Sequence, residues 1–316
     1  MSQVGVLVMA HGTPRRPEDI APFYTRIRRG RPPSAEQLAD LERRYAAIGG
    51  VSPLTERTMA QVDAVRAALA QRAPERYVVA YGAKHAEPLI EDAAAKLAAS
   101  GVEKVVGLVL TPHGSSMGSG EYLARAEAAL GGSCPFVPVC CWYAEPALVD
   151  LLAGRVTAAL ASLGAADRPG RSDVIFTAHS LPARVRDEGD TYPDQLADSA
   201  RLVAAAAGID RWHVAWQSAG RTPEPWLGPD VRDTVRHLAD PSGAARPDGI
   251  VVCPIGFVAD HLEVLYDLDM ELAAVAADAG VAYARTTSLN DDPRFIGVLA
   301  DVIARAAAGV AGAPQS

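Results

Sequence analysis

The sequence predicts an α/β protein of two similar doubly wound, Rossmann-like domains, each with a parallel four-stranded sheet, facing a central cleft. Three observations lead to this prediction. Short β-branched runs alternate with Ala-, Leu-, Arg- and Glu-rich stretches of helical periodicity, as in doubly wound folds. The runs are apolar on both faces, which is typical of parallel strands covered by helices. They also fall into two sets that resemble each other.

The predicted elements account for most of the chain. The first set of strands is expected at 4–10, 77–82, 104–111 and 136–140, and the second at 173–178, 213–217, 249–255 and 281–285. Helices are expected at 35–48, 55–73, 86–100, 119–130, 145–163, 194–207 and 293–309. Because ligands bind beyond the carboxyl ends of the strands in such sheets, functional residues are expected there.

The first strand of each set ends alike. The chain reads VLVMAHGTP at 6–14 and VIFTAHSLP at 174–182, so a histidine follows each apolar strand. We therefore expect an N-terminal domain over 1–148 and a C-terminal domain over 149–316, with a linker near 145–170. The last helix, at about 293–309, is expected either to stay with the C-terminal domain or to pack back on the N-terminal domain.

The composition of the chain excludes some classes of binding partner. The chain of 316 residues is 49% hydrophobic and 22% charged, with a formal net charge of −8. An acidic balance argues against nucleic acid and anionic membranes. No apolar run approaches the roughly 18–20 residues that span a bilayer, and the start MSQVGVLVMAHGTP lacks the features of a signal peptide. We expect a cytoplasmic protein without membrane insertion.

The four cysteines do not have the spacing of a paired metal site. They are Cys134, Cys140, Cys141 and Cys253. The adjacent Cys140 and Cys141 are expected to point to opposite faces of a strand. Free, buried thiols are therefore the interpretation of all four.

Five of the seven histidines follow predicted strands. They are His11, His85, His113, His179 and His261. A single histidine at a strand end is more often a structural hydrogen-bonding group than a catalyst. Five along one edge favour a functional cleft, in which an imidazole can accept a proton near neutral pH.

The segment 253–273 carries an acidic row. Glu263, Asp267 and Glu271 are spaced i, i+4, i+8, so on a helix they share one face. Like charges at i, i+4 cost roughly 0.2–0.5 kcal/mol each, and solvent or a cation must offset that. A solvated acidic face is the alternative, but the apolar residues around the row favour burial and a divalent cation.

Two further segments have competing interpretations. The basic run at 25–33 contains Arg28 and Arg29, whose guanidinium groups suit carboxylates; a solvated charged loop is the alternative. The segment 216–229 contains Trp216 and Trp226. These rings either line a flat apolar pocket or belong to the core of a rigid Pro/Gly loop.

At these residues the chain resembles the ferrochelatase family, most closely the monomeric soluble form of Gram-positive bacteria that makes coproheme. The resemblance covers nearly the whole chain. It rests on MAHGTP (9–14), YTRIRRGR (24–31), RYAAIGGVSPL (44–54), KHAEPLIEDA (84–93), CWYAEP (141–146), TAHSLP (177–182), YPDQL (192–196), WQSAGRTPEPWLGPDV (216–231) and GFVADHLEVLYDLDME (256–271). It implies a fold like that of the class II chelatases.

The resemblance also implies roles for particular residues. His179 would take pyrrole protons or bind the arriving metal, with Glu263 as its carboxylate partner; these are the catalytic candidates. The metal-binding candidates are His179, Glu263, Asp267 and Glu271. The substrate-binding candidates, among which Arg28, Arg29 and Ser52 would hold the carboxylates of the macrocycle, are His11, Arg28, Arg29, Ser52, His85, Tyr122 and Trp226.

Two departures from the family pattern concern specificity. His11 stands where soluble coproheme-forming relatives usually have Tyr, which makes this edge resemble the small cobalt and sirohydrochlorin chelatases. The segment 112–122 is rich in Gly and Ser where relatives carry Phe. Some relatives hold an iron–sulfur cluster through cysteines near the C-terminus, but no Cys follows Cys253, so no cluster is expected.

The expected function is insertion of Fe²⁺ into coproporphyrin III, ahead of protoporphyrin IX, without a bound organic cofactor. The alternatives are a specialised chelatase for Co²⁺, Ni²⁺, Cu²⁺ or Zn²⁺ acting on a tetrapyrrole or other ligand, and a non-catalytic porphyrin or metal carrier. The expected partners are the porphyrin and a divalent metal, with no nucleic acid. We expect a monomer, with transient contacts to heme-pathway enzymes as an option.

Overall fold

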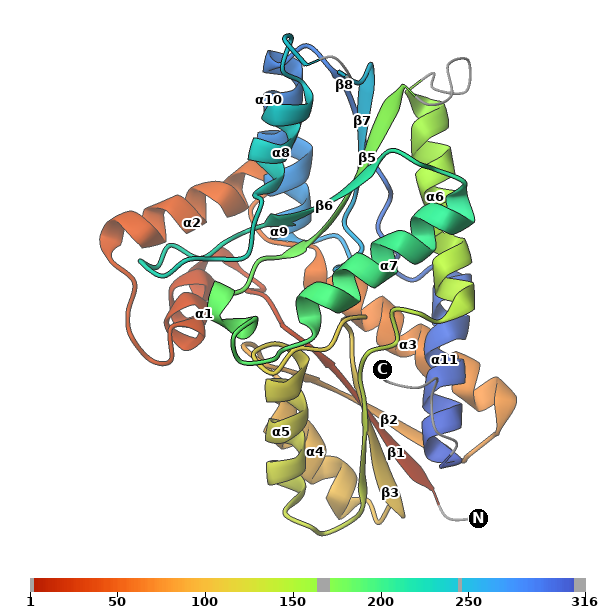
Figure 1. The fold of residues 1–316 in the computed structure, drawn as a ribbon. Helices are drawn as coiled ribbons and strands as arrows, with labels where there is room; N and C mark the ends of the chain where they lie inside the picture. Colours follow the sequence, from red (N-terminus) through yellow and green to blue (C-terminus); the bar gives the residue numbers. More distant parts are fainter. Residues whose placement is uncertain (1–2, 164–170, 244–245, 310–316) are drawn as a thin grey trace. The chain divides into compact units, whose positions relative to one another are not determined.

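The computed structural model describes residues 3–163, 171–243 and 246–309 (Figure 1). This part of the chain divides into two compact units. Unit 1 contains the chain up to Trp142, the short stretch Ala259–Leu262 and the chain from Leu289 onward. Unit 2 contains Tyr143–Val258 and Glu263–Ser288.

The first crossing between the units comes a few residues before the domain boundary expected at 148/149. That position lies inside helix α6 (Pro146–Ser162). The linker expected at 145–170 is therefore helical over most of its described length, and residues 164–170 lie outside the described part of the chain. Apolar residues at helical spacing along α6 bury one of its sides, which a solvated linker would not do.

Unit 1 is built on a parallel sheet with the strand order β2-β1-β3-β4. Its strands are β1 (Val4–Ala10), β2 (Tyr77–Ala83), β3 (Lys104–Val109) and β4 (Phe136–Val139). Its helices are α1 (Ile20–Ile27), α2 (Ala35–Ala47), α3 (Leu54–Arg72), α4 (Ile90–Ala99), α5 (Ser119–Leu130) and α11 (Pro293–Ala307). Every residue of the central strand β1 is buried, which explains its unbroken apolar run.

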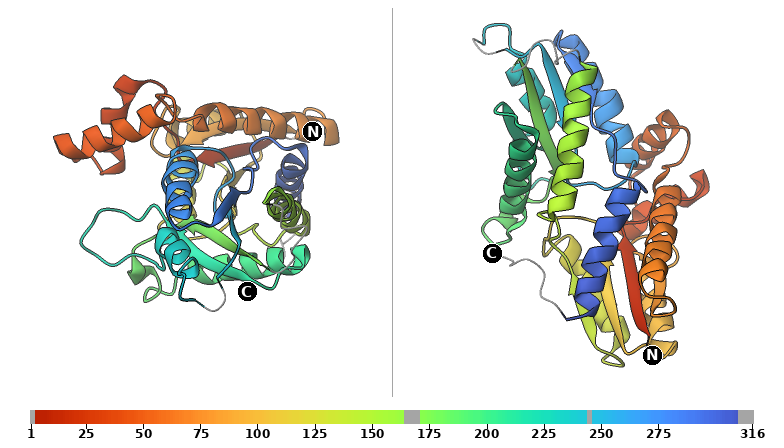
Figure 2. Two further views of the ribbon diagram at one scale, coloured as in Figure 1. Left: turned by 90° about the horizontal axis from the view of Figure 1, so that it is seen from above. Right: turned by 90° about the vertical axis from the view of Figure 1, so that its right-hand side faces the viewer.

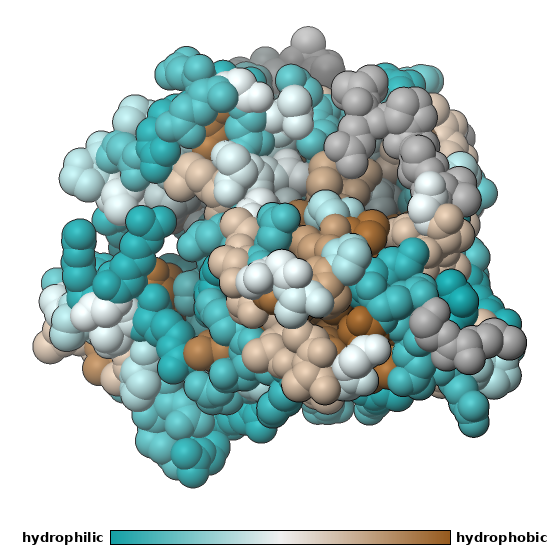
Figure 3. Space-filling view, turned by 90° about the horizontal axis from the view of Figure 1, so that it is seen from below, coloured by the Kyte–Doolittle hydropathy of each residue, from teal (hydrophilic) through white to brown (hydrophobic). Residues whose placement is uncertain are grey.

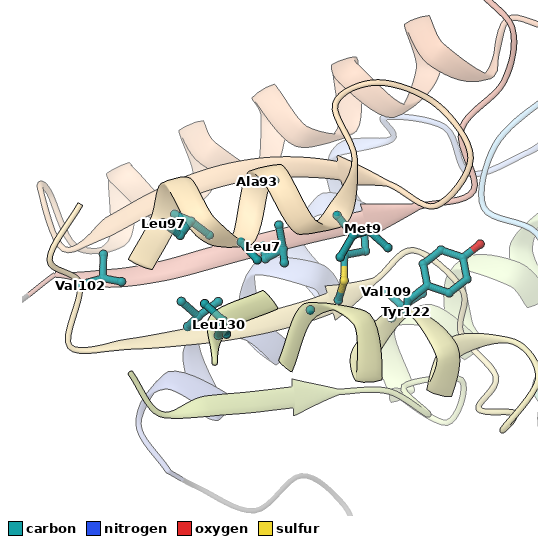
Figure 4. Close-up of a cluster of buried hydrophobic side chains, with 12 residues drawn as sticks. Leu7, Met9, Ala93, Leu97, Val102, Val109, Tyr122 and Leu130 are labelled. Atoms are coloured by element: carbon teal, nitrogen blue, oxygen red, sulfur yellow. The ribbon is translucent and has the colours of Figure 1, made fainter. Parts of the chain in front are cut away.

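The core of unit 1 lies between the sheet and the α4–α5 pair. Leu7 and Met9 of β1 pack with Leu97 of α4 and with Leu130 of α5 (Figure 4). These four side chains are at most 3% exposed, so the helical and strand periodicities of the sequence meet in one apolar layer.

Helix α11 belongs to unit 1 although it comes last in the chain. It packs against α3 and the β3–β4 side of the sheet (Figure 2). Phe295 of α11 is fully buried and stacks near Trp142, with the ring centroids 5.9 Å apart. The Arg72 guanidinium lies 2.6 Å from the Asp301 carboxylate. The last helix thus covers the N-terminal sheet.

Unit 2 repeats this architecture. Its sheet has the order β6-β5-β7-β8, again all parallel. Its strands are β5 (Ser172–His179), β6 (Trp212–Gln217), β7 (Gly249–Cys253) and β8 (Ala282–Arg285). Its helices besides α6 are α7 (Tyr192–Ala207), α8 (Val231–Leu238) and α10 (Ala273–Asp278). The prediction of two similar four-stranded parallel α/β halves is confirmed.

The segment that carries the acidic row is not one regular α-helix. A short α9 (Leu262–Leu265) precedes a π-helical segment, Asp267–Leu272, which continues into α10. The wide turn is seen in the Glu271 N–H, which donates to the Tyr266 carbonyl at 3.0 Å. Leu268 and Leu272 are fully buried in the core of unit 2, and this packing holds the segment against the sheet.

Helices α1 and α8, like the short α9 and α10, were absent from the sequence prediction. Helix α1 contains Pro22 and runs into the basic segment, so its pattern is short and interrupted. Helix α8 has eight residues and begins after Pro229, where Asp230 caps it through the Arg232 N–H. Both helices are too short for periodicity to reveal them.

The surface of the described chain is mostly polar. Hydrophilic side chains cover most of the face seen in Figure 3, with smaller apolar areas among them. Ile27 and Met270 are the large hydrophobic side chains exposed within the described ranges. None of the helices described is long and apolar enough to cross a membrane.

Candidate active site

His179 is the last residue of β5 and lies at the carboxyl edge of the unit 2 sheet. It pairs in register with Gln217, the last residue of β6. Its Nδ1 is 3.4 Å from the Gln217 carbonyl oxygen, and its own carbonyl accepts a hydrogen bond from the Tyr192 hydroxyl at 3.0 Å. The half-buried imidazole is therefore fixed to the edge where ligands bind in parallel sheets.

Gln217 links His179 to the acidic segment, and the sequence analysis missed it. Its side chain is 1% exposed. Its Oε1 accepts from the Thr177 hydroxyl at 2.8 Å, and its Nε2 donates to the Glu263 carbonyl at 2.9 Å. Because the Glu263 carbonyl can only accept a hydrogen bond, the Gln217 NH₂ group must face it, and this defines the orientation of the amide. The one available signal was a polar amide at the end of an apolar strand.

Tyr192 connects the same two residues from the other side. Burial raises the pKa of the Tyr192 hydroxyl, and the nearby negative charge of Glu263 raises it further. The Glu263 carboxylate therefore acts on the hydroxyl that binds the His179 carbonyl. Through Gln217 and Tyr192, the structure brings the two catalytic candidates into one network within unit 2.

The other two acidic residues have protein partners. The Ser218 hydroxyl donates to Asp267 Oδ2 at 2.5 Å, and Asp267 is only 9% exposed. Glu271 Oε2 lies 3.6 Å from the Arg232 guanidinium. A hydroxyl and a guanidinium thus offset part of the like-charge repulsion that the sequence analysis assigned to solvent or a cation.

The π-helical segment changes how the acidic row is aligned. Successive carboxylates of the row are four residues apart. This spacing is more than one turn of an α-helix, which has about 3.6 residues per turn, but less than one turn of the wider π-helix. Passing from α9 into the π-helix therefore keeps Glu263, Asp267 and Glu271 closer to one line than a regular helix would. The described residues contain no group of three or more His, Cys, Asp or Glu that could hold a metal ion, so these carboxylates form a row rather than a cage.

The five strand-end histidines do not gather along one edge, which corrects that expectation. His179 lies in unit 2, whereas the other four belong to unit 1. His113 is 1% exposed, and burial lowers its pKa to about 3. The His261 ring lies 3.0 Å from the Ala259 carbonyl in a local turn. Of the four histidines in unit 1, His11 and His85 are the two whose rings contact each other.

His11 and His85 lie side by side at the carboxyl edge of the unit 1 sheet. Their ring centroids are 4.8 Å apart, and the Phe23 ring lies 5.9 Å from that of His11. His11 Nδ1 is 3.0 Å from the carbonyl of Gly12. Gly12 has φ +81°, and a Cβ there would meet the Ala86 Cβ at 2.8 Å, so only glycine permits this turn.

The His85 imidazole is electrically neutral. Burial and then the neighbouring His11, Lys84, Arg125 and Arg26 lower the pKa of His85 to about 3. Its Nδ1 is buried and has no hydrogen-bond partner among the described residues. A neutral imidazole is the form that binds a metal cation.

The basic segment presents two arginines without carboxylate partners among the described residues. Arg28 lies over the Tyr24 ring, 5.7 Å from its centroid, and donates to the Arg31 carbonyl. Arg29 is exposed, has φ +55° and lines an open groove of about 800 Å³ beside α1. In contrast, Arg26 lies 3.7 Å from the Glu87 carboxylate. Arg28 and Arg29 are thus available to substrate carboxylates.

The remaining substrate-binding candidates have local structural roles. Ser52 is 6% exposed and its hydroxyl accepts from the Leu54 N–H at the start of α3. Tyr122 is 8% exposed at the end of the unit 1 core cluster, with its hydroxyl directed away from the other side chains (Figure 4). Substrate contact by either residue stays a prediction.

The two tryptophans of the 216–229 segment differ. Trp226 is half-buried, covers Gly220 and donates from its indole N–H to Thr222 at 2.9 Å. Trp216 is 2% exposed and packs on Tyr192, with centroids 5.4 Å apart. The suggestion that both line a pocket is therefore wrong for Trp216, which belongs to the core.

Comparison with known proteins shows which family this chain resembles. The model of the ferrochelatase family matches residues 3–307. The coproporphyrin III ferrochelatase of Bacillus subtilis (strain 168) is 45% identical over 304 residues, which cover 95% of this chain and 97% of that protein. The protein of the same name from Geobacillus thermodenitrificans (strain NG80-2) is 44% identical over 304 residues, covering 95% of each.

Solved structures share the fold at low identity. SirB from Bacillus subtilis with Fe³⁺ has a TM-score of 0.55 at 10% identity and covers 97% of this chain and 96% of its own. CbiX, described as the terminal enzyme of siroheme biosynthesis in denitrifying bacteria, has a TM-score of 0.54 at 16% identity and covers 95% and 98%. The fold is therefore that of these chelatases.

We predict that His85 stays neutral in the folded protein well below pH 6. The ordinary pKa of about 6.5 applies to the unfolded chain and about 3 to the folded chain. Unfolded protein therefore takes up the proton first, and His85 costs stability as the pH falls from about 6.5 towards 3.

Nitrogen-15 NMR of labelled histidines, with His85→Gln assigning the signal, measures this directly. The His85 ring should keep its neutral shifts down to about pH 4 in folded protein and titrate near pH 6.5 in urea. Protonation of the folded-state ring above pH 5 would refute the prediction.

Proposed function

This chain belongs to the ferrochelatase family, and we propose that it inserts Fe²⁺ into coproporphyrin III. The resemblance drawn from the sequence motifs is confirmed by the family match and by the curated relatives. The observation that carries the proposal is the network that joins His179 to Glu263 through Gln217 and Tyr192. A porphyrin carrier needs no such proton acceptor, which argues against the non-catalytic alternative.

The reaction requires two pyrrole protons to leave as the metal enters. A flat macrocycle shields its nitrogens, so the enzyme must bind it bent, with contacts at the rim offsetting the distortion. His179 is placed at the strand edge to accept a proton, and Glu263 to accept or relay the second. The entering cation lowers the pKa of the pyrrole N–H groups and so assists both transfers.

The acidic row gives the cation a route. Carboxylate oxygens suit hard divalent ions, and Glu263, Asp267 and Glu271 succeed one another along the α9 and π-helical segments. Ser218 and Arg232 hold Asp267 and Glu271 in place without closing them into a cage. We propose that each carboxylate contacts the ion in passing, because a closed site would retain it.

The arginines account for the choice of porphyrin. Coproporphyrin III is a tetracarboxylate and protoporphyrin IX a dicarboxylate, so the first offers more partners to Arg28 and Arg29. Guanidinium groups form paired, charge-assisted hydrogen bonds with carboxylates. Since neither arginine is neutralised by a carboxylate of the described chain, rim binding costs no existing ion pair.

A second candidate function is a chelatase for another divalent metal. It is favoured by the contact between the His11 and His85 rings, because the neutral imidazole of His85 suits Co²⁺, Ni²⁺, Cu²⁺ and Zn²⁺. The hydrogen bond between His11 Nδ1 and the Gly12 carbonyl supports the simpler view that His11 only orders this turn.

The proposal includes no iron–sulfur cluster and no bound organic cofactor. Clusters are held by four cysteine thiolates. Cys253 is buried in β7, where burial raises its pKa to about 12, and the other three cysteines belong to unit 1. We further propose a monomeric, cytoplasmic enzyme with at most transient contacts to other heme-pathway enzymes, which sedimentation analysis of the purified protein tests.

An anaerobic absorbance assay tests the function and its alternative together. Coproporphyrin III and protoporphyrin IX are each offered Fe²⁺, Co²⁺, Ni²⁺, Cu²⁺ and Zn²⁺. The proposal requires Fe²⁺ with coproporphyrin III to give the highest kcat/KM. If another metal is preferred and His11→Tyr restores preference for Fe²⁺, the second candidate is correct.

We predict that His179→Ala and Glu263→Gln each lower kcat by about 100-fold or more, the usual contribution of a positioned acid or base. Porphyrin binding, measured by fluorescence quenching, should remain. His237→Ala, on the exposed side of α8, is the matched control and should keep normal turnover. Normal turnover in either variant would remove that residue from the mechanism.

We predict that Arg29→Ala weakens coproporphyrin III binding about five-fold, which corresponds to about 1 kcal/mol for an exposed ion pair. The loss should be smaller for protoporphyrin IX, because it has fewer carboxylates. Arg16→Ala is the control, since Arg16 pairs with Asp19 away from the groove. If the wild-type protein, Arg29→Ala and Arg16→Ala bind coproporphyrin III with equal affinity, the basic run is a solvated loop.

A further inference from the structure

We propose that Cys140 and Cys141 form a vicinal dithiol that hydroperoxides oxidise reversibly to a disulfide. The pair follows β4, so it lies at the same carboxyl edge of the unit 1 sheet as His11. From the sequence, two buried thiols on opposite faces of a strand were expected. The structure places both residues after the strand, half-buried, with their sulfurs together.

The two sulfurs are already in contact. The Cys141 thiol donates a hydrogen bond to Cys140 Sγ, and the sulfurs are 2.9 Å apart. Cys141 has φ +60°, a left-handed conformation uncommon for a residue with a side chain. This turn replaces the alternation of a strand, which would have separated adjacent side chains.

The pair is held between two anchored neighbours. Val139 is buried and pairs with Leu108 across the β3–β4 ladder. Trp142 is 3% exposed and its indole N–H donates to the Val109 carbonyl at 3.2 Å. The residues on either side of the pair are therefore anchored to β3, which holds the two sulfurs close together.

Cys140 is the nucleophile of the pair. The hydrogen bond from Cys141 favours the Cys140 thiolate and lowers its pKa to about 7, and the thiolate is the reactive form. Both residues are half-buried, so small oxidants reach them. Cys253, in contrast, is 1% exposed and remains a thiol because burial raises its pKa to about 12.

The reaction balances with one hydroperoxide molecule. The Cys140 thiolate attacks a peroxide oxygen, the O–O bond breaks, and the leaving hydroxide (or alkoxide) takes a proton; Cys140 is then a sulfenic acid. The Cys141 sulfur attacks the Cys140 sulfur, the S–O bond breaks, and the departing hydroxide takes the Cys141 proton to form water. The two sulfurs lose two electrons, and the peroxide gains them.

The disulfide should be easy to reduce. Adjacent α-carbons are about 3.8 Å apart, below the roughly 4.4 Å at the lower end for ordinary disulfides. Ring closure therefore strains the backbone, and strained disulfides are the labile ones. Reversal by dithiothreitol is part of the proposal.

The test treats the full-length protein with hydrogen peroxide and maps thiols by mass spectrometry. Cys134→Ser serves as the background, because Cys134 shares the tryptic peptide with the pair. The peptide should lose two hydrogens and regain them with dithiothreitol. In Cys141→Ser on this background, the same peptide should instead carry oxygen or a dimedone adduct at Cys140.

Three results would overturn the proposal. The first is a pair that stays reduced while Cys134 of the wild-type protein is oxidised. The second is a disulfide that links Cys134 to Cys140 or Cys141 in the wild-type protein. The third is irreversible oxidation of both sulfurs without a disulfide. Circular dichroism of each variant establishes that it is folded, so a negative result counts against the chemistry.

Discussion

The buried amide of Gln217 is the interaction on which the candidate active site of unit 2 depends. Burying an amide without partners costs roughly 1–3 kcal/mol, so its environment must supply both an acceptor and a donor. Thr177 on β5 and the Glu263 main chain do so. Satisfying one side chain therefore fixes the strand that carries His179 relative to the segment that carries Glu263.

The rest of unit 2 supports that bridge. The parallel order β6-β5-β7-β8 places the ends of β5 and β6 side by side, and the buried Leu268 and Leu272 hold the π-helical segment against the sheet. The wide turn then presents the acidic row along one line. A single layer of apolar packing thus positions the proposed proton acceptors, His179 and Glu263, and the carboxylates of the acidic row.

The sequence was sufficient for the sheets and for the chemical types, but not for how they are joined. Apolar runs such as 4–10 identify buried strands because both faces are covered. The π-turn was missed because i, i+4 spacing fits it as well as a regular helix. Gln217 was missed because its partners lie 40 and 46 residues away. The contact between Cys140 and Cys141 depends on one left-handed residue, Cys141, which no pattern of residue types reveals.

The kcat of Gln217→Met tests most directly whether the amide bridge positions the site, because methionine keeps the volume of the side chain but removes both hydrogen bonds. Gln195→Met, on the exposed side of α7, is the matched control. If the bridge positions His179 and Glu263, kcat falls roughly 10- to 100-fold in the folded variant, while the Kd for porphyrin is unchanged. A folded Gln217→Met protein with the kcat of the control would contradict the account.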